Sequence, residues 1–333
     1  MSNIPQEVPT GAIRYNTDSN KMECFDGTKW WQVAVSSPDL NGGARGIFGG
    51  GNLAGGVTNV IQYITIPTTG NATDFGDLTV ARLGVEACGS RTRSVFMGGR
   101  TPTPQDTIDY VTIASTGNAI DFGNLIATRQ MSGTCSNATR GLNIAGNDHP
   151  SPNNYNRIEY ITIATTGNAG DFGDTTGTLY GFGCTATASP TRGVYAGAYG
   201  AGTNNTIEFV TIASQGNGQD FGDLVKKTYS LVTCSNSTRG LFAGGSPGYT
   251  TIGYITIATL GDATDFGTLS DGRFEFGATA SSVRGVFGGG IEPSKLDIID
   301  YVDIATQGDA VDFGNLTADT QGCAGTSNDH GGL

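Results

Sequence analysis

The sequence predicts an all-β chain, in which a small N-terminal β-meander precedes a six-bladed β-propeller with four antiparallel strands in each blade. The first observation is a tripeptide, Asp-Phe-Gly, that recurs with steps of 47, 50, 49, 45 and 47 residues. A period of about 40–50 residues is typical of propeller blades. Its six copies begin at Asp74, Asp121, Asp171, Asp220, Asp265 and Asp312. The second is composition: 53 Gly and only 14% charged residues favour strands joined by tight turns. The third is that the repeat is incomplete at both ends in complementary ways.

The N-terminal unit comprises residues 1–40. Short runs at 12–15, 21–25 and 29–33 predict three strands, with turns at 16–20 and 26–27 and a linker over 35–43. So few residues cannot bury a core of their own. The unit is rich in aromatic residues, as an interface is, and we expect four of them to attach it to a partner: Tyr15, Phe25, Trp30 and Trp31.

The repeat unit is clearest over residues 78–123 of the second unit, 41–333. Strands are predicted at 79–90, 94–97, 108–113 and 119–125, and Gly117-Asn118 suits a tight hairpin turn because both residues tolerate positive φ. An Arg precedes the second strand in all six units, at Arg45, Arg93, Arg140, Arg192, Arg239 and Arg284.

Closure of the ring follows from the two ends. The first unit begins at Arg45, on a second strand, and the last runs on into a first-strand pattern at 322–324 with no second strand after it. The C-terminal strand is therefore expected to complete the blade that Arg45 begins, which closes six blades and leaves no free sheet edge.

The order of these strands resembles the kelch repeat. The second strand ends in a double glycine at 49–50, 98–99, 244–245 and 288–289. Kelch repeats usually carry Trp in the fourth strand, where this chain has the Phe of Asp-Phe-Gly, so the chain is kelch-like. The resemblance covers roughly residues 41–333 and implies fold rather than function.

The wording of the repeat (160–173, YITIATTGNAGDFG) is similar to repeat proteins of marine bacteriophages, and residues 9–30 resemble a short unit of phage tail-fibre and other virion proteins. This resemblance implies a virion protein that is assembled in the host cytoplasm, attached near its N-terminus and displays a propeller.

Asp-Phe-Gly also occurs in kinases, where its Asp holds magnesium. Six copies at blade spacing favour a structural role, in which Phe packs between blades, Gly ends the strand and Asp holds a turn or pairs with Arg. Since the turns that carry the two charges fall on one face of each blade, we expect a ring of Arg–Asp contacts.

The sequence lacks the residue patterns that several classes of function require. The net charge of −12 disfavours nucleic acid, and no signal peptide or membrane-spanning stretch is visible. His149 and His330 share no metal-binding spacing, so we expect no zinc site and assign no metal ligand. The sequence leaves open whether a metal occupies the central channel. No catalytic motif or cofactor site is present, and we expect no enzyme. Five cysteines recur at one strand position and are expected to be buried and unpaired: Cys88, Cys135, Cys184, Cys234 and Cys323.

Function is expected on the loops between second and third strands, which differ in length while the scaffold repeats. Tyr and Asn side chains suit sugar binding, and the candidates are Tyr155, Asn153, Asn154, Tyr199, Asn205 and Tyr249. Three hypotheses remain open. The first is a tail or capsid appendage that binds other virion subunits or the host surface, the second an adhesin for a host cell-surface glycan, and the third a carbohydrate-active enzyme, which clustered carboxylates with raised pKa would favour.

Overall fold

The computed structural model describes residues 8–16, 21–32, 44–149, 153–177, 179–200 and 202–333. The chain separates into two compact units, Met1–Asn41 and Gly42–Leu333, one residue after the expected boundary. The expected linker and most of the turn at 16–20 lie outside the described residues. The described part is all β, as predicted, and contains no helix long and apolar enough to cross a membrane.

The N-terminal unit is a three-stranded antiparallel sheet in the order β1-β2-β3. Its strands are β1 (Ile13–Asn16), β2 (Lys21–Phe25) and β3 (Trp30–Gln32). Asp26 makes the β2–β3 turn, where its Oδ1 accepts hydrogen bonds from the amides of Thr28 and Lys29, both at 2.8 Å.

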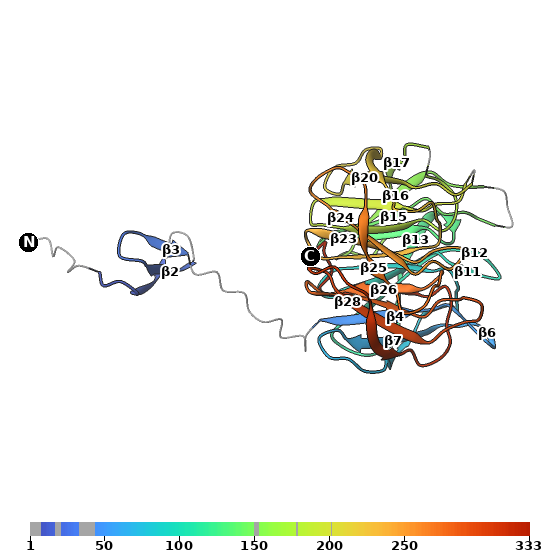
Figure 1. Cartoon of the computed structure of the whole chain (residues 1–333), viewed down its shortest axis with the longest axis horizontal. Helices are drawn as coiled ribbons and strands as arrows, with labels where there is room; N and C mark the ends of the chain where they lie inside the picture. The colour runs from blue at the N-terminus through green and yellow to red at the C-terminus, as the bar shows by residue number, and fades with distance from the viewer. Residues whose placement is uncertain (1–7, 17–20, 33–43, 150–152, 178, 201) are drawn as a thin grey trace, which may run out of the picture. The chain divides into compact units, whose positions relative to one another are not determined.

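In the described residues of the larger unit, six antiparallel sheets have four or five strands each, and they are numbered in the order of their second strands. Figure 1 labels several strands of these sheets. Their strands are β30 (Ala324–Ser327), β4 (Arg45–Gly49), β7 (Val60–Thr65) and β8 (Thr73–Asp77) in sheet 1; β9 (Glu86–Gly89), β10 (Arg93–Met97), β12 (Thr103–Thr112) and β13 (Ile120–Arg129) in sheet 2; β14 (Gly133–Ser136), β15 (Arg140–Ile144), β16 (Arg157–Thr162) and β17 (Gly170–Asp174) in sheet 3; β18 (Thr185–Ala188), β19 (Arg192–Ala196), β20 (Thr206–Thr211) and β21 (Gln219–Asp223) in sheet 4; β22 (Val232–Ser235), β23 (Arg239–Ala243), β24 (Thr251–Thr256) and β25 (Thr264–Thr268) in sheet 5; and β26 (Gly277–Ala280), β27 (Arg284–Gly288), β28 (Ile298–Asp303) and β29 (Val311–Asn315) in sheet 6.

The loops between second and third strands add short strands. In sheet 1 this loop forms a small hairpin, β5 (Asn52–Leu53) with β6 (Gly56–Val57), and in sheet 2 β11 (Arg100–Thr101) folds back on β12. We call the side of the unit that carries these loops the loop face.

The first strands lie next to one another in a cyclic order. β9 lies beside β14, β14 beside β18, β18 beside β22, β22 beside β26, β26 beside β30, and β30 beside β9. The C-terminal strand β30 pairs with β4, with Ala324 opposite Gly49, so the two ends of the larger unit share one sheet, as predicted.

Apolar side chains fill the space between neighbouring sheets. One cluster joins Ile47 and Phe75 of sheet 1 to Val85, Phe96 and neighbours of sheet 2. The Phe of every Asp-Phe-Gly is 2–3% exposed, and its ring meets the third-strand aromatic edge-on at 5.9–6.3 Å between centroids. The prediction that Phe packs between blades is confirmed for these sheets.

The predicted ring of Arg–Asp contacts is wrong. Each repeated guanidinium lies over the aromatic ring of its own third strand, 4.4–4.8 Å from the centroid. Its Nη1 donates to the carbonyl that follows the third strand of the next sheet, at 2.8–3.1 Å. Arg284 of sheet 6 thereby reaches Ile66 of sheet 1. The Asp of each Asp-Phe-Gly is exposed, and an exposed carboxylate gains little from a cation while a buried carbonyl needs a donor.

We expected the Gly of Asp-Phe-Gly to end its strand. It lies instead inside the strand, at a β-bulge. Gly76 has φ +149°, and a Cβ there would meet the backbone of Gly117 in the next sheet. Across this close approach Gly117 donates to the Phe75 carbonyl at 2.8 Å and the Asn118 Oδ1 accepts from the Asp77 amide at 3.1 Å. The same joint recurs between all six pairs of neighbouring sheets, including Gly70 of sheet 1 with Phe313 of sheet 6.

The first strand is shorter than predicted: 79–90 was expected in sheet 2, and β9 covers Glu86–Gly89. The preceding residues leave the sheet, and the guanidinium of Arg82 turns inward to Asp109 and to the carbonyls of Gly98 and Thr107. The five repeated cysteines are buried and unpaired, as predicted. Burial raises the pKa of the Cys88 thiol to about 12.

Candidate functional site: the loop face and the central cavity

The six loop residues expected to bind a ligand do not form one site. Asn153 and Tyr155 turn toward Asp148, with the Asn153 Nδ2 and the Tyr155 hydroxyl 2.9 and 3.3 Å from its Oδ2. Asn154 is exposed and bridges Asn147. These contacts order the described part of the sheet 3 loop, in which Asn153, Asn154 and Asn156 are exposed.

The other three candidates lie in sheets 4 and 5. The backbone carbonyl of Asn205 accepts a hydrogen bond from Leu224 at 2.6 Å, and the Tyr249 ring lies under the Lys226 ammonium at 4.8 Å. Tyr199 is 38% exposed and joins a group of three aromatic rings. Only Tyr199 therefore combines exposure with an aromatic platform.

The aromatic group consists of Phe182, Tyr199 and Tyr229, and we call it the aromatic cluster. Its ring centroids lie 5.4, 5.6 and 4.8 Å apart. Phe182 forms a β-bridge with Tyr199, and the Tyr229 carbonyl accepts from Ser246 at 2.9 Å. Phe182 and Tyr229 were not predicted from the sequence. Each directly precedes a residue, Gly183 or Ser230, that lines the central cavity described below.

A ring of backbone hydrogen bonds surrounds the loop end of this cavity, and we call it the collar. Each collar amide donates to the carbonyl of the collar residue in the preceding sheet, at 2.6–3.1 Å, until the sixth link returns to the first. All six residues have φ between +51° and +75°: Gly84, Met131, Gly183, Ser230, Glu275 and Gly322. Three of them are not glycine, and positive φ costs such residues about 1–2 kcal/mol.

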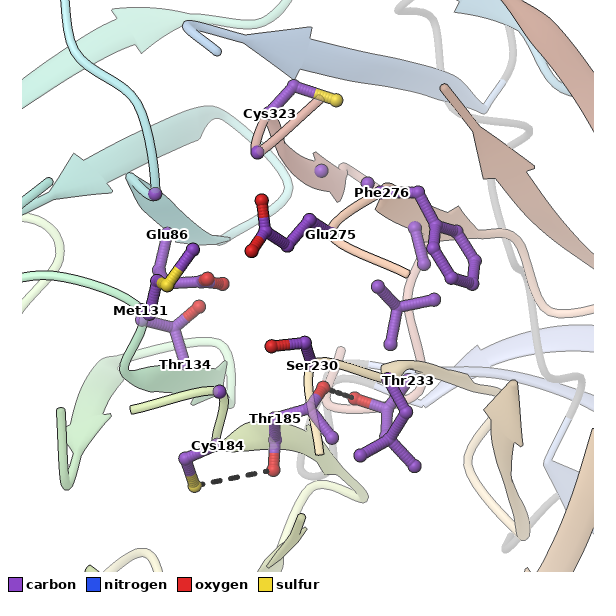
Figure 2. A pocket seen from close by; sticks show the side chains of 18 of the residues that line it. Glu86, Met131, Thr134, Cys184, Thr185, Ser230, Thr233, Glu275, Phe276 and Cys323 are labelled. Carbon is purple, nitrogen blue, oxygen red and sulfur yellow. Dashed lines mark hydrogen bonds between the residues drawn. The ribbon is translucent and has the colours of Figure 1, made fainter. Parts of the chain in front are cut away.

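The central cavity has a volume of about 70 Å³ and is lined by residues of all six sheets. Figure 2 shows the carboxylates of Glu86 and Glu275 and the hydroxyl of Ser230 directed into it. Burial raises the pKa of Glu86 well above its ordinary value. Burial also raises the pKa of Glu275, against a hydrogen bond from Gln321 at 3.2 Å.

The other end of the cavity is covered by residues 328–333. The His330 Nε2 lies 2.9 Å from the carbonyl oxygen of Gly89, and Gly331 donates to the carbonyl of Ser235 at 2.9 Å. Burial lowers the pKa of His330. His149 is exposed on the loop face, so the two histidines lie at different ends of the unit. Among the described residues, no three His, Cys, Asp or Glu side chains gather around one point.

Buried ion pairs that were not predicted from the sequence support the loop side of three sheets. Arg82 and Asp109 are 2.5 Å apart, Arg273 and Asp300 are 2.9 Å apart, and Arg129 pairs with Glu159. All three guanidiniums are fully buried. They escaped notice because the position is acidic in only four of the six sheets: sheets 1 and 5 have Gln62 and Gly253 there. In sheet 4 the acidic residue, Glu208, accepts a hydrogen bond from the Tyr195 hydroxyl.

The N-terminal sheet has two different faces. The pairing of Ile13 with Cys24, of Tyr15 with Met22 and of Cys24 with Trp31 places these residues on one side, which we call the apolar face. Its exposed fractions are 64% for Ile13, 58% for Tyr15, 41% for Met22 and 54% for Trp31. This face has the composition of a contact surface.

On the opposite face of the N-terminal sheet, the side chains contact one another. The Arg14 guanidinium lies 4.2 Å from the Trp30 centroid and pairs with Glu23 at 2.8 Å, and Phe25 packs on Trp30 at 5.3 Å. The four aromatic residues expected to attach the unit are thus divided: Tyr15 and Trp31 belong to the apolar face, and Phe25 and Trp30 to the other.

No family model matches the chain, and no curated protein matches it.

Proposed function

We propose that this chain is a non-catalytic bacteriophage virion protein, a tail or capsid appendage. Residues 1–40 attach it to other virion proteins, and the six sheets form a closed, kelch-like propeller that presents its loop face. The cyclic order of the first strands, the collar and the Arg284–Ile66 joint support closure. The virion assignment rests on the resemblance of the repeat and of residues 9–30.

The observation that carries the attachment role is the apolar face. Four large side chains more than 40% exposed stand together on a sheet of three short strands. A sheet of this size buries too little apolar surface to be stable alone, so covering this face stabilises both the unit and its contact.

Particle incorporation tests the attachment role. In the source phage, the double variant Ile13→Ser/Met22→Ser should reduce the protein in purified particles by about 10-fold or more, because each lost apolar contact weakens docking by about 1–3 kcal/mol. Immunoblotting of purified particles measures it, with immunogold labelling to locate the wild type. Val311→Ser, which removes a propeller side chain of 56% exposure, is the control. Absence of the wild-type protein from particles would refute the proposal.

The aromatic cluster favours a second candidate, an adhesin for a host cell-surface glycan. Stacked aromatic rings with one exposed member suit the apolar faces of sugars. Tyr199→Ala should then lower binding to the host glycan about 10-fold on a glycan array, while Tyr15→Ala leaves it unchanged. Equal glycan binding by the wild type and Tyr199→Ala would show that the aromatic cluster does not bind the glycan.

The carboxylates in the central cavity meet one condition set for an enzyme, because their pKa values are raised. The space around them does not suit glycoside hydrolysis. About 70 Å³ is far below the roughly 300–1,000 Å³ of sites that enclose small organic ligands, and hydrolysis needs two sugar rings beside the carboxylates. We therefore retain a binding role.

A further inference from the structure

We propose that the loop end of the central cavity binds one hard metal cation, calcium in the first place, through the side-chain oxygens of Glu86, Glu275 and Ser230. This inference is independent of the virion proposal, since it concerns only the cavity.

The two carboxylates converge from sheets that flank sheet 1. Glu86 begins β9 of sheet 2, and Glu275 precedes β26 of sheet 6. Between them the collar residue of sheet 1 is Gly322, which has no side chain to separate them. Figure 2 shows both carboxylates directed into the same space. Two acids in one small cavity repel each other unless a cation or a proton intervenes.

Among the described residues, none places a cation beside the Glu86 carboxylate. No described donor lies within hydrogen-bonding distance of its carboxylate, and desolvation alone accounts for its raised pKa. Glu275 receives one amide hydrogen bond, from Gln321. Arg100 acts on Glu275 only through its charge, without a hydrogen bond. Both carboxylates are half-buried. A carboxylate that loses part of its hydration without gaining a counter-charge is destabilised, and a bound cation would offset that loss.

Ser230 provides independent evidence of a ligand. The residue is 6% exposed, and its Oγ is buried without a hydrogen-bond partner among the described residues. Buried hydroxyls are nearly always satisfied in native proteins. This hydroxyl points into the cavity, and Gly183 beside it leaves it room, since a Cβ there would meet the Ser230 Oγ at 2.7 Å.

The backbone places both groups at a conformational cost. Ser230 and Glu275 have φ of +53°, where sheets 1, 2 and 4 use glycine. Met131 of sheet 3 has φ +51° in the same collar, so the collar fixes where these side chains leave the backbone and does not by itself mark them as ligands.

The chemistry of the donors selects the ion. Carboxylate and hydroxyl oxygens are ligands for hard cations, and calcium accepts six to eight oxygens in variable geometry, with waters completing the shell. The cavity of about 70 Å³ holds an ion with a few waters, since one water needs about 15–30 Å³. Magnesium requires nearly ideal octahedral geometry, which three protein oxygens from three sheets do not impose.

Calorimetric titration of the full chain tests the proposal, after treatment with chelator and desalting, with CaCl₂, MgCl₂ and KCl as probes. We expect saturable binding of one calcium ion per chain, weaker binding of magnesium, and calcium affinity reduced about 10-fold or more in both Glu86→Gln and Glu275→Gln, since ligand charge sets affinity. Asp265→Asn, which neutralises an exposed repeated carboxylate, should bind as the wild type does.

Two further measurements keep the test decisive. Near-ultraviolet circular dichroism without calcium reports whether the glutamine variants fold, and Ser230→Ala offers a milder change, with an expected loss of several-fold. Calcium should also raise the melting temperature of the wild type and not of the double variant Glu86→Gln/Glu275→Gln. No saturable calcium binding by the wild type, or unchanged affinity in the folded double variant, would overturn the proposal. Magnesium binding as tight as calcium binding would overturn the choice of ion.

Discussion

Gly173→Ala should lower the free energy of unfolding of the larger unit by about 3 kcal/mol or more. Gly173 has φ +149°, and a Cβ there would lie 2.5 Å from the carbonyl oxygen and 2.7 Å from the carbonyl carbon of Gly216 in the next sheet. Backbone cannot move aside as a side chain can, so alanine adds conformational strain to overpacking, each costing about 1–3 kcal/mol.

The shift would also disturb three hydrogen bonds of this joint. Gly216 donates to the Phe172 carbonyl at 2.9 Å, Gly218 to the Asp174 carbonyl at 2.7 Å, and the Asp174 amide to the Asn217 Oδ1 at 3.0 Å. Denaturant unfolding followed by fluorescence measures the loss.

Gly216→Ala is the matched control for Gly173→Ala, from the other side of the same contact. No atom lies within 4 Å of the Cβ position of Gly216, and its φ lies outside the left-handed region. Alanine there should leave stability unchanged or raise it by about 0.4–1 kcal/mol. Equal loss in the two variants would show that the close approach of the sheets is not what requires glycine at 173.

Arg273→Met should destabilise the larger unit by about 3–5 kcal/mol, because it leaves the Asp300 carboxylate buried without its cation. Asp300 is 1% exposed and retains only the hydroxyl and amide of Ser270 as donors. The carbonyls of Phe287 and Ile298 lose their guanidinium donors as well, at 3.3 and 3.4 Å.

Adding Asp300→Asn to Arg273→Met should recover part of the loss, since a neutral amide is cheaper to bury than a carboxylate. Arg157→Met is the control. The Arg157 side chain is 35% exposed, and its Nη1 lies 3.8 Å from Glu159, so this substitution should cost no more than about 1 kcal/mol. Equal midpoints of denaturation for Arg273→Met and Arg157→Met would show that burial does not make the Arg273 pair important.

The strands of each repeat could be predicted from the sequence, but the contact partners of its side chains could not. The alternation of apolar residues located the strands, and the partial units predicted that β30 pairs with β4. The Arg–Asp prediction failed because opposite charge is a weak guide at a surface. The partners of Arg140 are a ring in its own sheet and the carbonyl of Ile212 in the next, and a carbonyl leaves no mark in a sequence.

The candidate site escaped prediction for a related reason. Glu86, Ser230 and Glu275 occupy positions that differ from unit to unit, and a search for repetition passes over them. What brings them together is the collar, whose members are far apart in the chain. Tyr199 was found because it stands in a variable loop, whereas Phe182 and Tyr229 precede first strands and look like ordinary core residues.

The joint between sheets has a consequence for how such a chain can change. Every sheet offers the same two halves of a joint, an arginine with a bulged glycine on one side and a carbonyl with a tight turn on the other. At this joint any unit therefore fits any neighbour, and replacing one unit by a copy of another would create no new kind of contact there. Recombination between such units could alter the loops while every seam stays the same, so the loop face can diversify faster than its support.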